Sequence, residues 1–297
     1  MKARPGNMFR ISALIFFVIF YGPVWAQEPI QLLVRADDMG VTHDVNLAII
    51  RAYKEGIVTS AGIMPVSRYF EEAVRLCKEH PGLAAGIHLT LLGTRERPVL
   101  SPEEVPSLVN EKGFFYETME QLEAAGPEAE EIEREIRAQV GKVRASGLDF
   151  VYMDMHRGVP LKAIEEIMLQ ICREEEIIYA EHLSPEAYPH YEWNNIVPES
   201  WPNMILPDGG IVYYAAPAFS REDRQSFFDA LNSLQPGRWM TLVHPGLADP
   251  ERASATELMY APETLEIIKE RQIELVSYDD LQVEIYGKEG RGRPYIP

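Results

Sequence analysis

Strand-like apolar runs alternate with amphipathic, helix-like segments along most of the chain. The strand-like runs are residues 31–36, 59–66, 83–91, 150–155, 176–181, 239–243 and 273–277. Helical spacing of apolar residues is found at 45–54, 69–79, 128–145, 161–174, 221–234 and 262–271. Repeated strand-then-helix order predicts a mostly parallel sheet with helical crossovers. About seven such units predict an α/β fold whose strands form a closed or nearly closed barrel.

Two stretches interrupt this alternation. Residues 93–126 and 183–214 are rich in proline, glycine and aromatic residues, and we expect both to be long loops over one end of the barrel. Long loops in a compact domain usually carry function. Aromatic side chains of the second stretch either face a sugar or pack the loop onto the barrel; they are Tyr188, Tyr191, Trp193, Trp201, Tyr213 and Tyr214. No linker divides the chain, so a single domain is predicted over 27–286, with a mobile tail at 287–297.

The first 26 residues have the pattern of a signal peptide. A basic start is followed by an apolar run at 11–21, and Ala26 offers a small residue for cleavage before Gln27. This run of 11 residues is short for a membrane-spanning helix, which needs about 20, although an uncleaved anchor is the alternative. We therefore expect a secreted or periplasmic protein whose mature chain has no membrane span.

The charge of the chain is strongly negative, with 46 acidic and 28 basic residues. Loss of the three basic residues of the predicted signal peptide changes the net charge from −18 to −21. Such a surface repels phosphate backbones. We therefore expect no nucleic acid as a partner, while a homodimer is left open.

The two cysteines, Cys77 and Cys172, each lie in a helix-like stretch among aliphatic neighbours. This pattern predicts buried free thiols. An exported protein could also form a disulfide, so pairing is the open alternative.

Polar residues with catalytic potential fall where the predicted strands end. In a parallel barrel, the carboxyl ends of the strands and the loops that follow them form the site. These ends carry Asp37 and Asp38 (first strand), His88 (third strand), Asp154 and His156 (the strand at 150–155) and His244 (the strand at 239–243). Four strands are thus expected to bring carboxylates and imidazoles to one rim.

A carboxylate with two imidazoles is a ligand set for one divalent metal ion with an open coordination position. Such an ion lowers the pKa of a bound water to about 7, and a second carboxylate can accept the proton of that water. The chain thus has the parts of a metal-dependent hydrolase. Zinc, magnesium and the transition metals all stay open as the bound ion.

Each candidate also has a structural alternative. Paired aspartates could cap a helix, His88 could be a hydrogen-bonded core histidine, and His156 could pair with Asp154 on one face of a strand. The HPG segment at 244–246 could be only a turn. The convergence of four strand ends on one rim favours the functional interpretation.

The remaining histidines give weaker signals. His80 is expected near the carboxyl end of a helix, where it interacts with the helix dipole. His43, His182 and His190 are expected in loops, where no role can be assigned to them. Substrate-binding residues are therefore not identified.

Five segments, taken together, resemble the YdjC-like carbohydrate deacetylases, a relative of the polysaccharide deacetylases. They are VRADDMGVTHDVNLAI (34–49), GIVTSAGIMP (56–65), GIHLTL (86–91), MDMHRG (153–158) and LVHPG (242–246). The closing ELVSYDDL extends the resemblance over 32–281. It implies a distorted (β/α) barrel and hydrolysis of acetylated amino sugars by a metal-activated water.

The resemblance also implies roles for individual residues. The metal ligands would be Asp38, His88 and His156. Asp37 would be the general base, and His244 would protonate the leaving amine. Asp154 would orient His156 from behind the metal.

Two segments depart from the family pattern, and the later one is the aromatic stretch at 183–214, which is unlike the family's compact members. After the fifth predicted strand the chain reads IIYAEHLSPE, where the family usually has a basic residue near a proline turn. An acetylated sugar or glycan is still the substrate that the resemblance implies, with its identity open. The alternatives are another metal hydrolase that cleaves a phosphoester or a different amide, and a non-catalytic glycan-binding protein.

Overall fold

The computed structural model describes residues 29–93, 95–157, 162–180, 202–204, 213–215 and 224–287. The predicted signal peptide, the tail after residue 287, His182, His190 and most of the second aromatic stretch lie outside these residues. Their predicted roles stay predictions.

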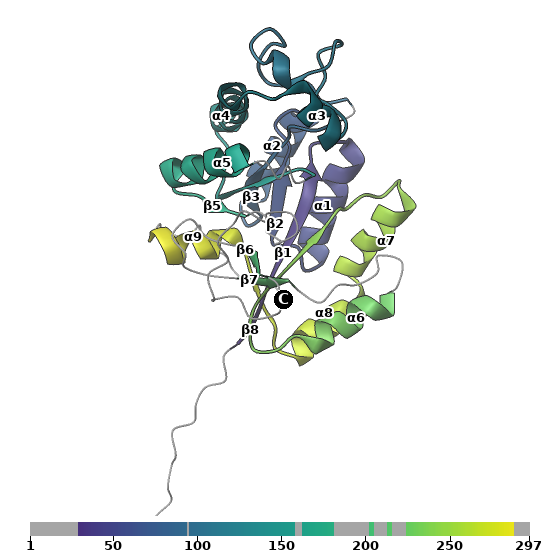
Figure 1. Ribbon diagram of the computed structural model, residues 1–297. Helices are drawn as coiled ribbons and strands as arrows, with labels where there is room; N and C mark the ends of the chain where they lie inside the picture. The colour runs from purple at the N-terminus through teal and green to yellow at the C-terminus, as the bar shows by residue number, and fades with distance from the viewer. Residues whose placement is uncertain are drawn as a thin grey trace, which may run out of the picture.

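Nine strands in the described part of the chain form one sheet, in the order β5-β4-β3-β2-β1-β8-β7-β6 with β9 beside β1. They are β1 Ile30–Met39, β2 Ser60–Ile63, β3 Ala84–Leu89, β4 Tyr152–Met155, β5 Ile178–Tyr179, β6 Pro202–Met204, β7 Tyr213–Ala215, β8 Gly237–Val243 and β9 Glu274–Val276. Every predicted strand is present, and all pairs are parallel except β6 with β7. The sheet curls into a half-barrel, which confirms an α/β fold of the distorted (β/α) barrel type (Figure 1).

Most of the helices cover the outside of this curled sheet (Figure 1). They are α1 His43–Glu55, α2 Phe70–Glu79, α3 Met119–Ala125, α4 Ala129–Ala145, α5 Lys162–Glu175, α6 Arg224–Ser233, α7 Pro250–Met259, α8 Pro262–Glu270 and α9 Tyr278–Tyr286, with a short 3₁₀ helix η1 at Pro106–Leu108. Among the described helices, none is long and apolar enough to cross a membrane.

The sequence prediction missed several of these elements. The first expected loop, 93–126, contains η1 and α3, and the second contains β6 and the start of β7. Helix α7 was also missed, although Asp249 caps its amino end and Pro250 occupies its first turn, which is a recognised helix start. Ser277 and Asp280 form a capping box that begins α9.

Alternation along the strands separates two cores. Leu32 and Val34 of β1 pack outward, in the large cluster beneath the helices. Leu33 points inward, into a smaller cluster with Tyr152 and Tyr278. The rings of these two tyrosines stack with centroids 3.9 Å apart and fill the floor of the half-barrel. Inward-facing residues nearer the carboxyl ends of the strands therefore lie above these tyrosines, at the open end of the half-barrel.

Both cysteines are buried free thiols, as predicted. Cys77 lies 3.6 Å from the sulfur of Met39. The predicted helix-end histidine is also confirmed, because the Nδ1 atom of His80 lies 2.9 Å from the carbonyl oxygen of Leu76 at the end of α2.

Candidate active site

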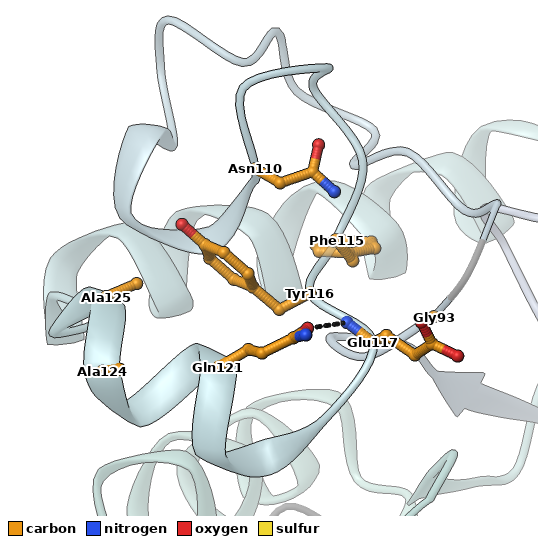
Figure 2. Close-up of a pocket in the computed structure, with 8 residues that line it drawn as sticks. All are labelled: Gly93, Asn110, Phe115, Tyr116, Glu117, Gln121, Ala124 and Ala125. Carbon is orange, nitrogen blue, oxygen red and sulfur yellow. Dashed lines mark hydrogen bonds between the residues drawn. The ribbon is translucent and has the colours of Figure 1, made fainter.

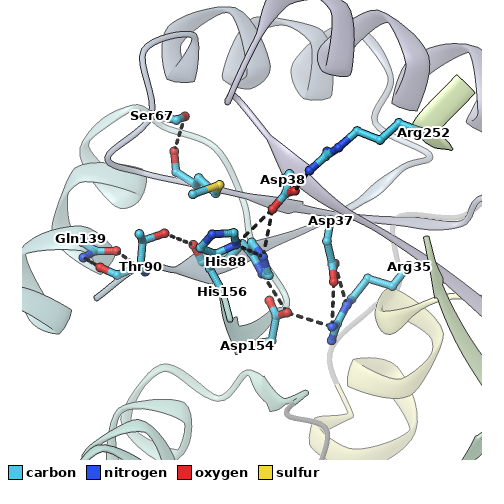
Figure 3. A network of polar contacts seen from close by, with 11 residues as sticks. Arg35, Asp37, Asp38, Ser67, His88, Thr90, Gln139, Asp154, His156 and Arg252 are labelled. Atoms are coloured by element: carbon cyan, nitrogen blue, oxygen red, sulfur yellow. Dashed lines mark hydrogen bonds and ion pairs between the residues drawn. The ribbon is translucent and has the colours of Figure 1, made fainter. Parts of the chain in front are cut away.

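Three strands, β1, β3 and β4, bring five of the predicted site residues together at the carboxyl end of the sheet, and β2 lies between β1 and β3 (Figure 3). Asp37 and Asp38 come from β1, His88 from β3, and Asp154 and His156 from the end of β4. The register of β3 and β4 sets His88 directly beside Asp154. The strand between them and β1 carries Gly62, where a Cβ would lie 3.2 Å from that of His88 and 3.4 Å from Asp37 Oδ1.

A bulge in β1 decides where the paired aspartates point. Neighbouring residues of a regular strand face opposite sides, so Asp37 and Asp38 could not both reach the inner face. Asp38, however, has a φ of 70°, and the pairing of β1 with β2 slips between Ala36 and Met39. This irregularity, typical of functional sites, turns the Asp38 carboxylate toward the two histidines.

The carboxylate of Asp38 and two imidazoles converge on one point. Asp38 Oδ1 lies 3.1 Å from Nδ1 of His156 and 3.5 Å from Nε2 of His88. The two ring nitrogens are 3.3 Å apart. Asp38 is 2% exposed, and its Oδ1 has no hydrogen-bond partner among the described residues. One buried carboxylate oxygen and two ring nitrogens, all of them atoms that bind metals, therefore lie beside one another, which fits a divalent cation.

The protonation of His88 follows from its second contact. Asp154 Oδ2 lies 2.8 Å from Nδ1 of His88, and a carboxylate can only accept, so Nδ1 donates and Nε2 faces the convergence point. Burial alone would lower the pKa of His88, but the carboxylates of Asp154 and Asp37 raise it well above its usual value. Nε2 is thus the ring nitrogen available to a metal ion, which binds neutral imidazole and would take the place of a proton there.

The position of Asp154 corrects one detail of the prediction. The family resemblance implied that it orients His156. Asp154 contacts and orients His88 instead. The parallel pairing of β3 with β4 places the two residues directly beside each other. Contact between a carboxylate and the distal nitrogen of a ligand histidine is the usual support of metal sites.

Arg35 links the two carboxylates that do not join the convergence point. Its Nε and Nη2 atoms donate to both oxygens of Asp37, at 2.8 and 3.0 Å, and Nη2 also lies 2.9 Å from Asp154 Oδ2. All three side chains are almost fully buried, and the guanidinium compensates the charges of both carboxylates. Nη1 donates to the carbonyl oxygen of Ala180 at 2.7 Å, so a basic group from β1 reaches the end of β5.

Arg252 of α7 reaches the other face of Asp38. Its Nη2 donates to Asp38 Oδ2 at 2.7 Å, which leaves Oδ1 for the convergence point. The Arg252 stem packs against Gly246, where a Cβ would lie only 2.9 Å from that of the arginine. No sequence pattern pointed to Arg252 as a site residue, because α7 was not predicted.

His244 follows β8 directly. Val243 pairs with Ala36, so the next residues of the two strands, His244 and Asp37, lie side by side at the strand ends. Met240 faces the inside of the half-barrel, and by alternation along the strand His244 faces the same side. The turn after it is fixed by Asp44, whose Oδ2 accepts from the backbone N–H groups of Leu247 and Ala248. His244 thus lies at the predicted strand end, and its role as an acid stays a prediction.

His43 lies away from this group. It begins α1 instead of lying in a loop, and its exposed ring contacts Glu72 at 2.8 Å.

Known proteins are similar to this chain over most of its length. The family model described as YdjC-like protein matches residues 31–284. A carbohydrate deacetylase of Brevibacillus brevis is 34% identical over 266 residues, which cover 84% of this chain and 99% of the relative. A carbohydrate deacetylase of Enterococcus faecalis is 29% identical, over 84% of this chain and 98% of that relative. A solved structure from Enterococcus faecalis V583, of a protein named for cellobiose-phosphate cleavage, has a TM-score of 0.71 and 28% identity, and the match covers 85% of this chain and 99% of that one.

Proposed function

This chain belongs to the YdjC-like protein family, and on that premise we propose that it is a metal-dependent N-deacetylase of acetylated amino sugars. Two of its similar relatives are named carbohydrate deacetylases. The observation that carries the proposal is the convergence of one carboxylate oxygen and two ring nitrogens, from Asp38, His88 and His156, at a single point.

These three residues would hold the metal ion. When bound, a divalent cation polarises the acetyl carbonyl and lowers the pKa of a water molecule to about 7. The protein would fix Asp38 through Arg252 and His88 through Asp154, so that both ligands present one chosen atom each. Three protein ligands leave coordination positions open for water and substrate.

Asp37 would accept the proton of the attacking water. Its two oxygens each receive a hydrogen bond from Arg35, yet a carboxylate has about four lone-pair positions, so it keeps capacity to accept a proton. Its carboxylate lies within 4.8 Å of a ring nitrogen of His88, close to the convergence point. His244, on the adjacent strand end, would donate a proton to the amine as the C–N bond breaks.

The surroundings favour an amide over a phosphoester. A phosphoester site needs cationic groups that remain available to the phosphate oxygens. In the described part of the site, Arg35 already compensates Asp37 and Asp154, and Arg252 is bonded to Asp38. The three carboxylates of Asp37, Asp38 and Asp154 outnumber these two guanidinium groups, which supports a neutral substrate.

Acetate release from a panel of N-acetylated mono- and oligosaccharides tests this proposal. The protein is first stripped with a chelator and then supplied with one divalent metal at a time. We expect activity that depends on added metal and that is lost in Asp38→Ala. Absence of acetate release with every metal and every sugar would refute the deacetylase assignment. Equal activity of stripped and reloaded protein would refute metal dependence.

A further inference from the structure

The turn that follows β1 is closely held by residues outside the candidate active site. The carbonyl oxygen of Asp38 accepts from the backbone N–H of Val41 at 3.2 Å, which closes a turn over residues 38–41. Gly40, at the third position of this turn, has a φ of 105°, a conformation that favours glycine. A Cβ on Gly40 would also lie only 2.3 Å from Ser67 Oγ, so the turn is tightly packed on that side.

Asn46 of α1 binds the backbone of this turn. Its Oδ1 accepts from the backbone N–H of Gly40 at 2.7 Å, and the carbonyl oxygen of Gly40 accepts from the backbone N–H of Tyr69 at 2.8 Å. Asn46 and Gly40 are both buried, so without Asn46 the N–H of Gly40 would lose its partner away from water, which is costly. The conformation of Gly40, and with it that of Asp38 two residues earlier, therefore depends on Asn46.

Glu72 of α2 decides which way the amide of Asn46 faces. Nδ2 of Asn46 donates to Glu72 Oε2 at 2.8 Å, and a carboxylate can only accept, so Oδ1 of Asn46 faces Gly40. The other oxygen of Glu72 lies 2.8 Å from Nδ1 of His43, the exposed histidine at the start of α1. A chain of contacts thus runs from His43 at the surface through Glu72 and Asn46 to Gly40.

Asp38 needs this support because its own backbone is strained. Residues other than glycine rarely adopt a φ of 70°, and such a conformation persists only where the surroundings hold it. The same conformation turns the Asp38 carboxylate toward His88 and His156. Loss of the Asn46 contact should let Asp38 relax toward regular strand geometry, in which neighbouring side chains face opposite sides, and its carboxylate would then leave the histidines.

We propose that Asn46 is a positioning residue for the metal ligand Asp38, and that Glu72 orients Asn46 for this purpose. The effect on metal affinity rests on the proposed function above, whereas the effect on the conformation of Asp38 does not. The proposal also accounts for His43, to which the sequence assigned no role, as the outer end of the chain of contacts.

Zn²⁺ affinity tests the proposal in Asn46→Ala, with Asn110→Ala as the matched control. Oδ1 of Asn110 likewise accepts from backbone N–H groups, those of Lys112 and Phe114, in the segment between β3 and α4 that Figure 2 shows. Both variants lose the same kind of contact in a turn, but only the turn at 38–41 carries a candidate ligand. We expect the Zn²⁺ dissociation constant to rise about 10–100-fold in Asn46→Ala and to stay unchanged in Asn110→Ala. Equal dissociation constants in the two variants would overturn the proposal.

A reversal of polarity separates positioning from a general loss of stability. Asn46→Asp keeps the acceptor for Gly40 but sets a carboxylate against Glu72, so it should weaken Zn²⁺ binding. Adding Glu72→Gln restores a donor between the two side chains and should recover most of the loss, whereas additive losses would overturn the proposal. Glu71→Gln, the same change of charge at the adjacent exposed position of α2, should leave Zn²⁺ binding unchanged. This comparison decides the question even if Asn46→Ala does not fold.

Crystal structures of the metal-free wild type and of metal-free Asn46→Ala separate this inference from the deacetylase function. In the variant we expect Asp38 to leave its φ of 70° and its Oδ1 to move away from Nδ1 of His156, now 3.1 Å away. This displacement would support the positioning role even if the protein binds no metal ion and deacetylates no sugar. An Asp38 that keeps both its conformation and this contact in folded Asn46→Ala would overturn the role, whatever the activity of the wild type.

Discussion

The contact between Asp154 and His88 makes a quantitative prediction for Asp154→Asn. In the wild type, Oδ2 of Asp154 accepts from His88 Nδ1 at 2.8 Å and lies 2.9 Å from Arg35 Nη2. An asparagine oxygen in the same place can still accept both bonds. Its NH₂ group then takes the place of Oδ1, which is buried and has no hydrogen-bond partner among the described residues. The shape of the site is therefore kept, while the negative charge is lost.

The loss of charge sets the size of the effect. A hydrogen bond to a charged group contributes about 1.5–3 kcal/mol, against about 0.5–1.5 kcal/mol for a neutral one. The His88 bond should thus lose about 1 kcal/mol or more, and the imidazole becomes a weaker ligand. Removing such an outer contact typically lowers metal affinity about 10–100-fold. Arg35 keeps Asp37 as its partner, so the fold should survive.

Competition with a chromophoric chelator measures the Zn²⁺ dissociation constant, and circular dichroism checks the fold. Asp149→Asn is the control, because it removes the same charge from an exposed position just before β4. We expect an increase of about 10–100-fold in the dissociation constant for Asp154→Asn and little change for Asp149→Asn. An Asp154→Asn protein that is folded and binds Zn²⁺ as tightly as the wild type would refute the role of His88 Nε2 as an oriented ligand.

Three further predictions address the acid–base pair, Arg252 and export. Asp37→Asn and His244→Ala should each lower turnover on an acetamide by about 10²–10⁴ with unchanged metal content; on an acetyl ester with a good leaving group, His244→Ala should lose far less, and equal losses on both substrates would exclude its acid role. Arg252→Met should lower the Tm of metal-free protein, because it leaves the buried Asp38 carboxylate without its cation, and added metal should then raise Tm more than in the wild type; an unchanged metal-induced shift in Tm would contradict this. We also propose that the protein is exported, so mass spectrometry of secreted material should find an amino terminus at or within about two residues of Gln27, whereas an intact Met1 would argue against cleavage.

The sequence alone determined which residues could meet. Apolar runs and helical spacing fixed the order of strands and helices, and parallel strands carry their carboxyl ends to one edge by geometry. Asp37, Asp38, His88, Asp154 and His156 could therefore be assigned to one site without coordinates, and the structure brings these five together.

Only the tertiary structure decided how these residues are held. The turn of Asp38 toward the histidines depends on a bulge and a left-handed backbone conformation, which strand periodicity cannot reveal. The pairing of Asp154 with His88 depends on inter-strand register, and the contact of Arg252 with Asp38 joins residues 214 positions apart. Likewise, residues 93–126 had no clear periodicity, because their stability comes from buried carboxylates of α4 and from core contacts rather than from a local repeat. Local patterns encode elements, whereas the partners of each buried charge are set by long-range packing.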